Sequence, residues 1–132
     1  MGHKTNLLRK QSKVWGTTTC IFVSPYTELH LISVVAGGYC SRHSHQEKWN
    51  SFYCLAGKID VVIYRTYDGE EIEERTTLSA KECTDVPPNL DHKFECQEDA
   101  EVLEIYWVNQ IDHSDINRKS DGGHQPVKGE VR

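Results

Sequence analysis

The residues of this chain with the clearest chemical potential are two histidines, His43 and His45, separated by one serine. In a β-strand, residues i and i+2 project from the same face, so two imidazoles at this spacing can bind one metal ion without distorting the backbone. The chain contains 7 histidines, so a His-x-His triplet arises by chance at odds of roughly one in three. Gly37 and Gly57, at fixed distances on either side, reduce the chance expectation to roughly two in a thousand. Together these residues indicate a metal site.

The segment from Gly37 to Gly57 resembles the first motif of the cupin superfamily, G-x5-H-x-H-x3,4-E-x6-G. Asn50 stands where that motif has a glutamate, and its neutral amide oxygen is a weaker donor to a cation than a carboxylate. Without the negative charge of the glutamate, the metal site is more positive by one unit, which favours an anionic substrate or a metal-bound hydroxide.

A second segment, from Lys81 to Cys96, is similar to the second cupin motif, G-x5-P-x-G-x2-H-x3-N. Pro87 and His92 are retained, whereas Lys81 and Cys96 replace the first glycine and the final asparagine. Asn89 replaces the second glycine and tolerates the left-handed turn conformation.

The resemblance covers about residues 17–108 and implies an antiparallel barrel of about six to eight strands. It implies that His43, His45 and His92 face inward onto one divalent transition metal, with Asn50 as a fourth ligand. Three imidazoles and water suit Fe, Mn, Ni, Cu or Zn alike. Glu47 is a rival carboxylate ligand, since positions 43, 45 and 47 alternate onto one strand face, although the motif places it in a loop.

The elements that must position these ligands are predicted to be strands. Segments rich in β-branched or aromatic residues are separated by Gly, Pro, Asp or Asn, and they cover residues 17–23, 29–36, 51–55, 59–66, 71–78 and 101–108. The dipeptide Asp68-Gly69 predicts a tight hairpin turn. Short strands at near-regular spacing predict an all-β fold, a small antiparallel barrel or jelly roll. That fold agrees with the one the resemblance implies.

Composition divides the chain into three parts. Residues 1–16 form a basic entry arm, because the first thirteen carry Lys4, Arg9, Lys10 and Lys13 and no acid. Residues 17–108 form the barrel. Residues 109–132 are charged and contain glycine and proline but few apolar side chains, which predicts an extended tail with little core of its own.

The alternation of side chains along the predicted strands indicates which residues form the walls of a substrate pocket. Position 50 shares a strand face with Phe52, and His92 shares one with Phe94, while Glu104 and Tyr106 share another. The two phenylalanines also suit plain core packing. Glu104 lies within an apolar strand and must face either a polar pocket or solvent, and solvent is the commoner environment for a carboxylate. His30 is expected to be hydrogen-bonded or solvated rather than a ligand.

Charge and hydropathy exclude several classes of protein. A net charge of -5 and a pI near 5.8 argue against a general nucleic-acid or membrane-surface binder. The chain lacks an apolar run near the roughly 20 residues that span a bilayer, and lacks an apolar segment typical of a secretion signal. We therefore expect a cytoplasmic protein with no membrane partner.

The chain contains 5 cysteines, an odd number, and none of them forms a CxxC pair, which predicts reduced thiols. Cys40 and Cys96 lack the orienting motif of a thiolate nucleophile.

The sequence therefore favours a metal-binding cupin that acts on a small polar molecule, with the reaction left open among oxygenase, isomerase or epimerase, and lyase. One alternative is a non-enzymatic module that binds a sugar or another small ligand. The other is a scaffold with a vestigial site, forming a homodimer through its outer sheet as similar cupins commonly do.

Overall fold

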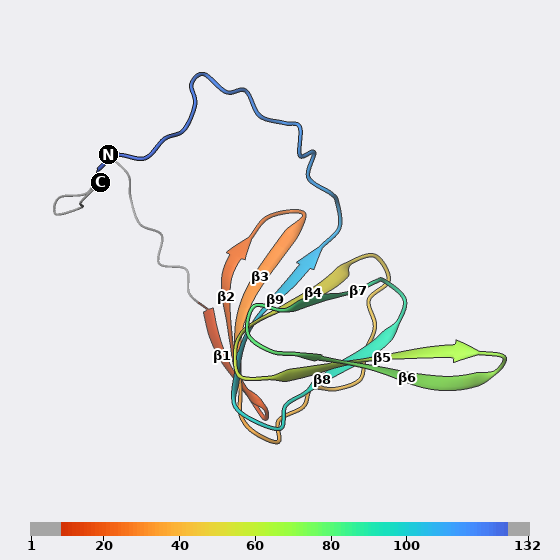
Figure 1. Cartoon of the computed structure of the whole chain (residues 1–132). Coiled ribbons are helices and arrows are strands. Elements are labelled where there is room, and N and C mark those ends of the chain that lie inside the picture. Colours follow the sequence, from red (N-terminus) through yellow and green to blue (C-terminus); the bar gives the residue numbers. More distant parts are fainter. Residues whose placement is uncertain (1–8, 127–132) are drawn as a thin grey trace.

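The computed structural model describes residues 9–126, and within them the chain forms two antiparallel sheets that face each other (Figure 1). The larger sheet has the order β1-β2-β3-β9-β4-β7, and the smaller has the order β6-β5-β8. The strands are β1 (Arg9–Lys13), β2 (Gly16–Val23), β3 (Thr27–Val34), β4 (Trp49–Ala56), β5 (Ile59–Tyr67), β6 (Glu70–Leu78), β7 (Cys83–Val86), β8 (Asp91–Glu95) and β9 (Ala100–Trp107). The predicted all-β jelly-roll fold is confirmed. The described part of the chain contains no helix long and apolar enough to cross a membrane.

The hydrophobic core lies between the two sheets. Alternate residues of each strand point into it, as the two-residue period of a strand requires. The larger sheet contributes Ile32, Val34, Phe52, Cys54, Val86, Ala100 and Val102, and the smaller sheet and its flanks contribute Ile59, Val61, Ile63, Leu78, Phe94 and Cys96. Trp15 packs against this core and places its ring edge-on to Phe94, with 5.0 Å between centroids.

The segment between β3 and β4 closes one side of the barrel by lying along β8. Cys40 N donates to Phe94 O, and His43 and His92 exchange both of their backbone hydrogen bonds, at 3.1 and 2.8 Å. Further along, Asn89 N donates to His45 O at 2.7 Å. The segment with the histidine pair is therefore held by the strand that carries the third histidine.

The strands predicted from the sequence are present, with ends shifted by at most two residues. Three further strands, β1, β7 and β8, are short and carry mostly polar side chains, so their pairing depends on tertiary contacts rather than on a local pattern. Part of the segment expected to be an arm is thus the edge strand β1, which pairs with β2.

Several turns place their residues in the left-handed region. Asp68 and Gly69 have φ of 49° and 79°, which confirms the tight turn predicted between β5 and β6. Lys81 and Asn89, which replace the two glycines of the second motif, have φ of 71° and 66°. At Gly57, whose φ is 77°, an added Cβ would lie 2.0 Å from the backbone oxygen of Asp99, so only glycine fits.

Residues 109–126 follow β9 as an exposed segment without strands. At its base, Val108 N donates to Tyr26 O at 3.1 Å. Ile111 and Ile116 remain 80% and 60% exposed, so neither contributes the roughly 1.5 to 3 kcal/mol that full burial of an aliphatic side chain provides.

We predict that truncation after Gln110 leaves the barrel as stable as the full chain. The melting temperature should change by less than about 2 °C in differential scanning calorimetry, because residues 111–126, the described part of the removed segment, are exposed. Loss of several degrees or aggregation of the truncated protein would show that the tail contributes to folding.

Candidate metal centre

The inward-facing side chains change from apolar to polar toward one end of the barrel. Along β9, Val102 is followed on the same face by Glu104 and then by Tyr106. The neighbouring strands follow the same order, so that Val102 pairs with Ile32 and Cys54, Glu104 with His30 and Phe52, and Tyr106 with Glu28 and Asn50. The histidines lie at the polar end of the barrel. The site therefore has an apolar base, formed by the core, and a polar opening.

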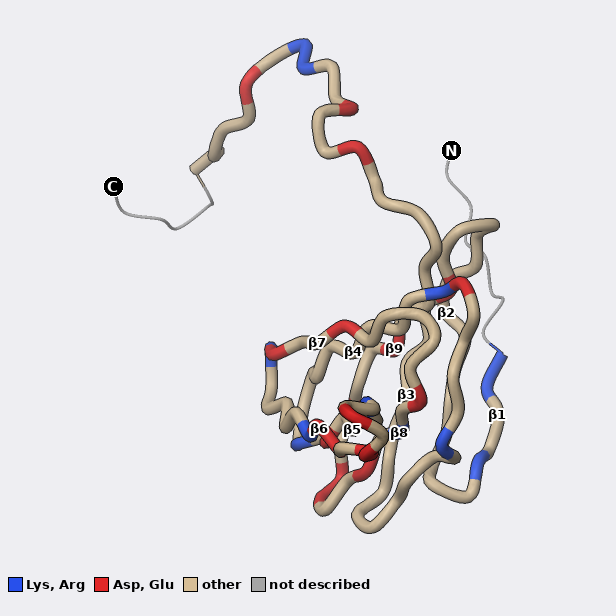
Figure 2. Tube along the Cα trace, turned by 90° about the vertical axis from the view of Figure 1, so that its right-hand side faces the viewer, with Lys and Arg blue, Asp and Glu red and all other residues tan. Residues whose placement is uncertain are grey.

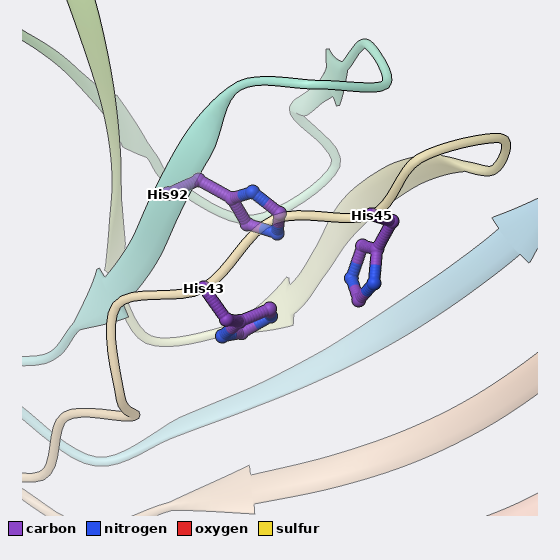
Figure 3. A group of neighbouring side chains, drawn as sticks. All are labelled: His43, His45 and His92. Atoms are coloured by element: carbon purple, nitrogen blue, oxygen red, sulfur yellow. The ribbon is translucent and has the colours of Figure 1, made fainter.

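The structure brings His43, His45 and His92 together (Figure 3). The segment after β3 carries the first two and β8 carries the third. One nitrogen from each ring lies within 4.8 Å of the others, and the ring centroids are 4.6 to 5.3 Å apart. Among the described residues they form the one such group of His, Cys, Asp or Glu side chains.

The hydrogen bonds of two of these rings determine which nitrogen carries the proton. The Nδ1 atoms of His43 and His92 lie 2.7 and 3.0 Å from the backbone oxygens of Ser41 and Leu90. A carbonyl oxygen only accepts, so each Nδ1 is the N–H donor and each neutral ring keeps its lone pair on Nε2. The Nε2 of His45 is buried and has no hydrogen-bond partner within residues 9–126. A metal ion would satisfy all three nitrogens.

Asn50 is fully buried beside this group. Its Oδ1 lies 3.1 Å from Nε2 of His92, and its Nδ2 lies 3.5 Å from the Ile105 oxygen. This contact joins an imidazole nitrogen and an amide oxygen, both of which are atoms that can bind a metal ion. Two ligands at about 2.1 Å from a metal and at right angles are about 3.0 Å apart. The separation of Asn50 Oδ1 from His92 Nε2 is therefore compatible with both atoms facing one ion.

The electrostatic surroundings favour the neutral form of two of the imidazoles, those of His45 and His92. Burial, followed by the charges of His43, Lys48 and His92, lowers the pKa of His45 to about 4. Burial also lowers the pKa of His92, against the opposing hydrogen bond to Leu90. A neutral imidazole is the form that binds a metal, and the lowered pKa values of His45 and His92 favour that form.

Two other candidates lie outside the group. Glu47 is exposed in the loop before β4 and does not join the three histidines. His30 places Nε2 3.2 Å from Glu28 Oε2, as expected for a hydrogen-bonded histidine, and its ring lies edge-on to Tyr106.

A cavity of about 470 Å³ opens beside His43. Phe94, Glu104 and Tyr106, all predicted as pocket residues, line it. Phe52 does not, which corrects its assignment to the pocket. It is 1% exposed and packs in the core behind Phe94, with ring centroids 6.3 Å apart.

Glu104 is buried, so the expectation that it faces solvent is wrong. The inward face of β9 places it in the cavity wall, where it is 8% exposed and hydrogen-bonded by the side chains of Tyr106 and Asn50. Burial raises the pKa of this carboxyl above its usual range. Glu104 is therefore positioned to hold a proton inside the cavity.

Sequence reasoning missed the contribution of β1 to the cavity. Gln11 and Lys13 line it together with Trp15 and Thr18. A short polar strand that pairs only at a sheet edge has no distinctive pattern, and the basic composition of the segment was the sole local signal.

The cysteines near the site are not nucleophiles. Cys40 accepts a hydrogen bond from Phe94 N at 3.2 Å, and burial raises its pKa to about 11. Burial likewise raises the pKa of Cys96 to about 12. Both thiols remain protonated at neutral pH, as the sequence predicted.

Comparisons with known proteins identify the fold. No family model and no curated protein matches the chain. The chain is similar to the structure of KdgF from Halomonas sp., with a TM-score of 0.63 and 16% identity over 77% of this chain and 89% of that one. An RmlC-like cupin from Shewanella frigidimarina gives a TM-score of 0.63 at 18% identity, over 78% and 86% of the two chains.

A third similar structure is oxalate decarboxylase of Bacillus subtilis, a protein with Mn(II) centres. Its TM-score is 0.65 at 16% identity, over 85% of this chain and 32% of that one. This chain therefore spans about a third of that protein. At such identities the likeness concerns the fold.

We predict that Asn50→Asp tightens metal binding. The substitution places a charged oxygen where Asn50 Oδ1 now lies, 3.1 Å from His92 Nε2, without changing side-chain length. An added anionic ligand should lower the dissociation constant about ten-fold or more at neutral pH in a competition titration with a chromophoric chelator. An unchanged constant would show that position 50 does not contact the ion.

Proposed function

We propose that this chain, which has the cupin fold, binds one divalent transition metal and uses it to act on a small polar molecule. The ligands are His43, His45 and His92, with Asn50 as the fourth. The observation that carries the proposal is the convergence of three imidazole groups, two with the Nδ1 proton fixed by a backbone carbonyl and one with a buried, unsatisfied Nε2.

The ligand chemistry supports a transition metal but not one particular ion. Imidazole suits Fe, Mn, Ni, Cu and Zn, and selection among them depends on geometry and availability. The four proposed ligands are neutral, so they leave the full charge of the ion uncompensated. Oxalate decarboxylase, with its Mn(II) centres, has a similar fold, which supports including manganese among the ions to be tested.

A bound divalent ion would polarise an oxygen of a substrate that reaches it. The side chains of the chain itself provide the remaining functions. Glu104 places a carboxyl in the cavity wall, where burial raises its pKa, and the Tyr106 side chain lies beside it. Trp15 and Phe94, in edge-on contact, shield one wall from water. A buried carboxyl in a cavity beside a metal site can donate or accept a proton, which favours proton-transfer chemistry such as isomerisation or elimination.

The direct test is metal content. Wild-type protein loaded with metal and dialysed should retain about one ion per chain by plasma mass spectrometry, because three imidazoles hold one ion through several bonds at once. His45→Ala and His92→Ala should lose it. His113→Ala, a change in the exposed tail, is the matched control and should retain the ion. Equal metal content in all four proteins would refute the site.

A second test separates an enzyme from a binding module. In a turnover screen of small polyols, sugars and organic acids, we expect Glu104→Gln to lower kcat by about a hundred-fold or more, the usual contribution of a positioned acid or base. Its metal content should stay at the wild-type level, since Glu104 is not among the proposed ligands. Saturable ligand binding without turnover in either protein would favour the non-enzymatic module.

A further inference from the structure

We propose that Lys13 is the anion-binding residue of the cavity and that the molecule bound there is a small organic acid. Its carboxylate would meet the Lys13 ammonium while another oxygen of the same molecule faces the metal site at His43. Both side chains line the one cavity of about 470 Å³. This inference rests on the proposed function and names the substrate class for that site.

The first support is the placement of β1. Gln11 pairs with Thr18 and Lys13 pairs with Gly16, and the two residues share the strand face that lines the cavity. Lys10, at the opposite parity, belongs to the other face. The turn that follows β1 is held against the barrel, because Val35 N donates to Trp15 O at 3.0 Å and the Trp15 ring packs on Phe94. Lys13 is thus positioned by an ordered element.

The second support is the charge environment. Among the described residues, Arg42, Arg65, Arg75 and Lys93 form ion pairs with carboxylates, whereas Lys13 forms none. Figure 2 shows basic segments along β1, while acidic segments gather on the β5–β6 hairpin. The Lys13 ammonium is therefore available to an anion from outside the chain.

The donor set indicates the kind of anion. One ammonium and the amide of Gln11 match the two oxygens of a carboxylate, whereas a phosphate dianion is typically bound by several donors or by a guanidinium fork. The rings of Trp15, Tyr39 and Phe94 offer an apolar wall for a carbon skeleton. A volume of about 470 Å³ lies in the range of small-molecule sites.

The test measures binding of gluconate to the zinc-loaded protein by isothermal titration calorimetry, with the neutral polyol glucitol as the comparison ligand. We expect gluconate to bind more tightly than glucitol to the wild type. Lys13→Gln should weaken gluconate binding about ten-fold, as loss of one charge-assisted contact predicts, and leave glucitol binding unchanged. Lys13→Arg should keep the preference. Lys10→Gln removes the same charge from the other face of β1 and should behave as wild type.

Zinc content measured on the same samples separates the two proposals. Weaker gluconate binding in Lys13→Gln at full zinc content supports the inference. Equal affinity in Lys13→Gln and wild type, equal losses in Lys13→Gln and Lys10→Gln, or no saturable gluconate binding to the wild type would overturn it while the metal site stands. A wild type without zinc would refute the metal site, and this inference with it.

Discussion

The reciprocal backbone hydrogen bonds between His43 and His92 are the contact on which the rest of the structure depends. They join the segment after β3 to the free edge of β8 and so close the barrel on that side. They also set the separation of the two imidazoles, whose centroids are 4.6 Å apart. Closure of the barrel and assembly of the ligand group are therefore one event, so a metal ion that binds the histidines also stabilises the closed barrel.

The polar end of the barrel reduces the size of the hydrophobic core. Asn50, His92 and Glu104 occupy inward positions that an apolar side chain would fill in a purely structural barrel. Each buried polar group costs about 1 to 3 kcal/mol when it is left without a partner. The hydrogen bonds of Glu104 to Tyr106 and Asn50, and of His92 to Leu90, offset part of this cost. Among the buried side-chain nitrogen and oxygen atoms of residues 9–126, His45 Nε2 is the one that remains without a partner.

The features that could be predicted from the sequence are those determined by the spacing of neighbouring residues. The His-x-His pair with its flanking glycines and the Asp68-Gly69 turn both depend on neighbouring residues, and both lie as expected. His92 was identified through the resemblance although β8 itself was not predicted. Burial of Glu104 and the core position of Phe52 depend on which side of β9 and β4 faces the opposite sheet and on how deep each residue lies. The alternation of side chains along a strand predicts which face of the sheet a residue lies on, but not how deeply it is buried. The pairing of β1 depends on the edge of another strand, β2, which no local pattern in β1 indicates.

Lys81 and Asn89 adopt a backbone conformation that is usually left to glycine. Both adopt positive φ at positions where the motif has glycine, and a left-handed conformation costs an L-residue about 1 kcal/mol. The fold tolerates this cost because the turns connect strands whose pairing is fixed elsewhere, and Asn89 N also donates to His45 O. At these two positions the backbone conformation of a glycine is therefore adopted by residues with larger side chains.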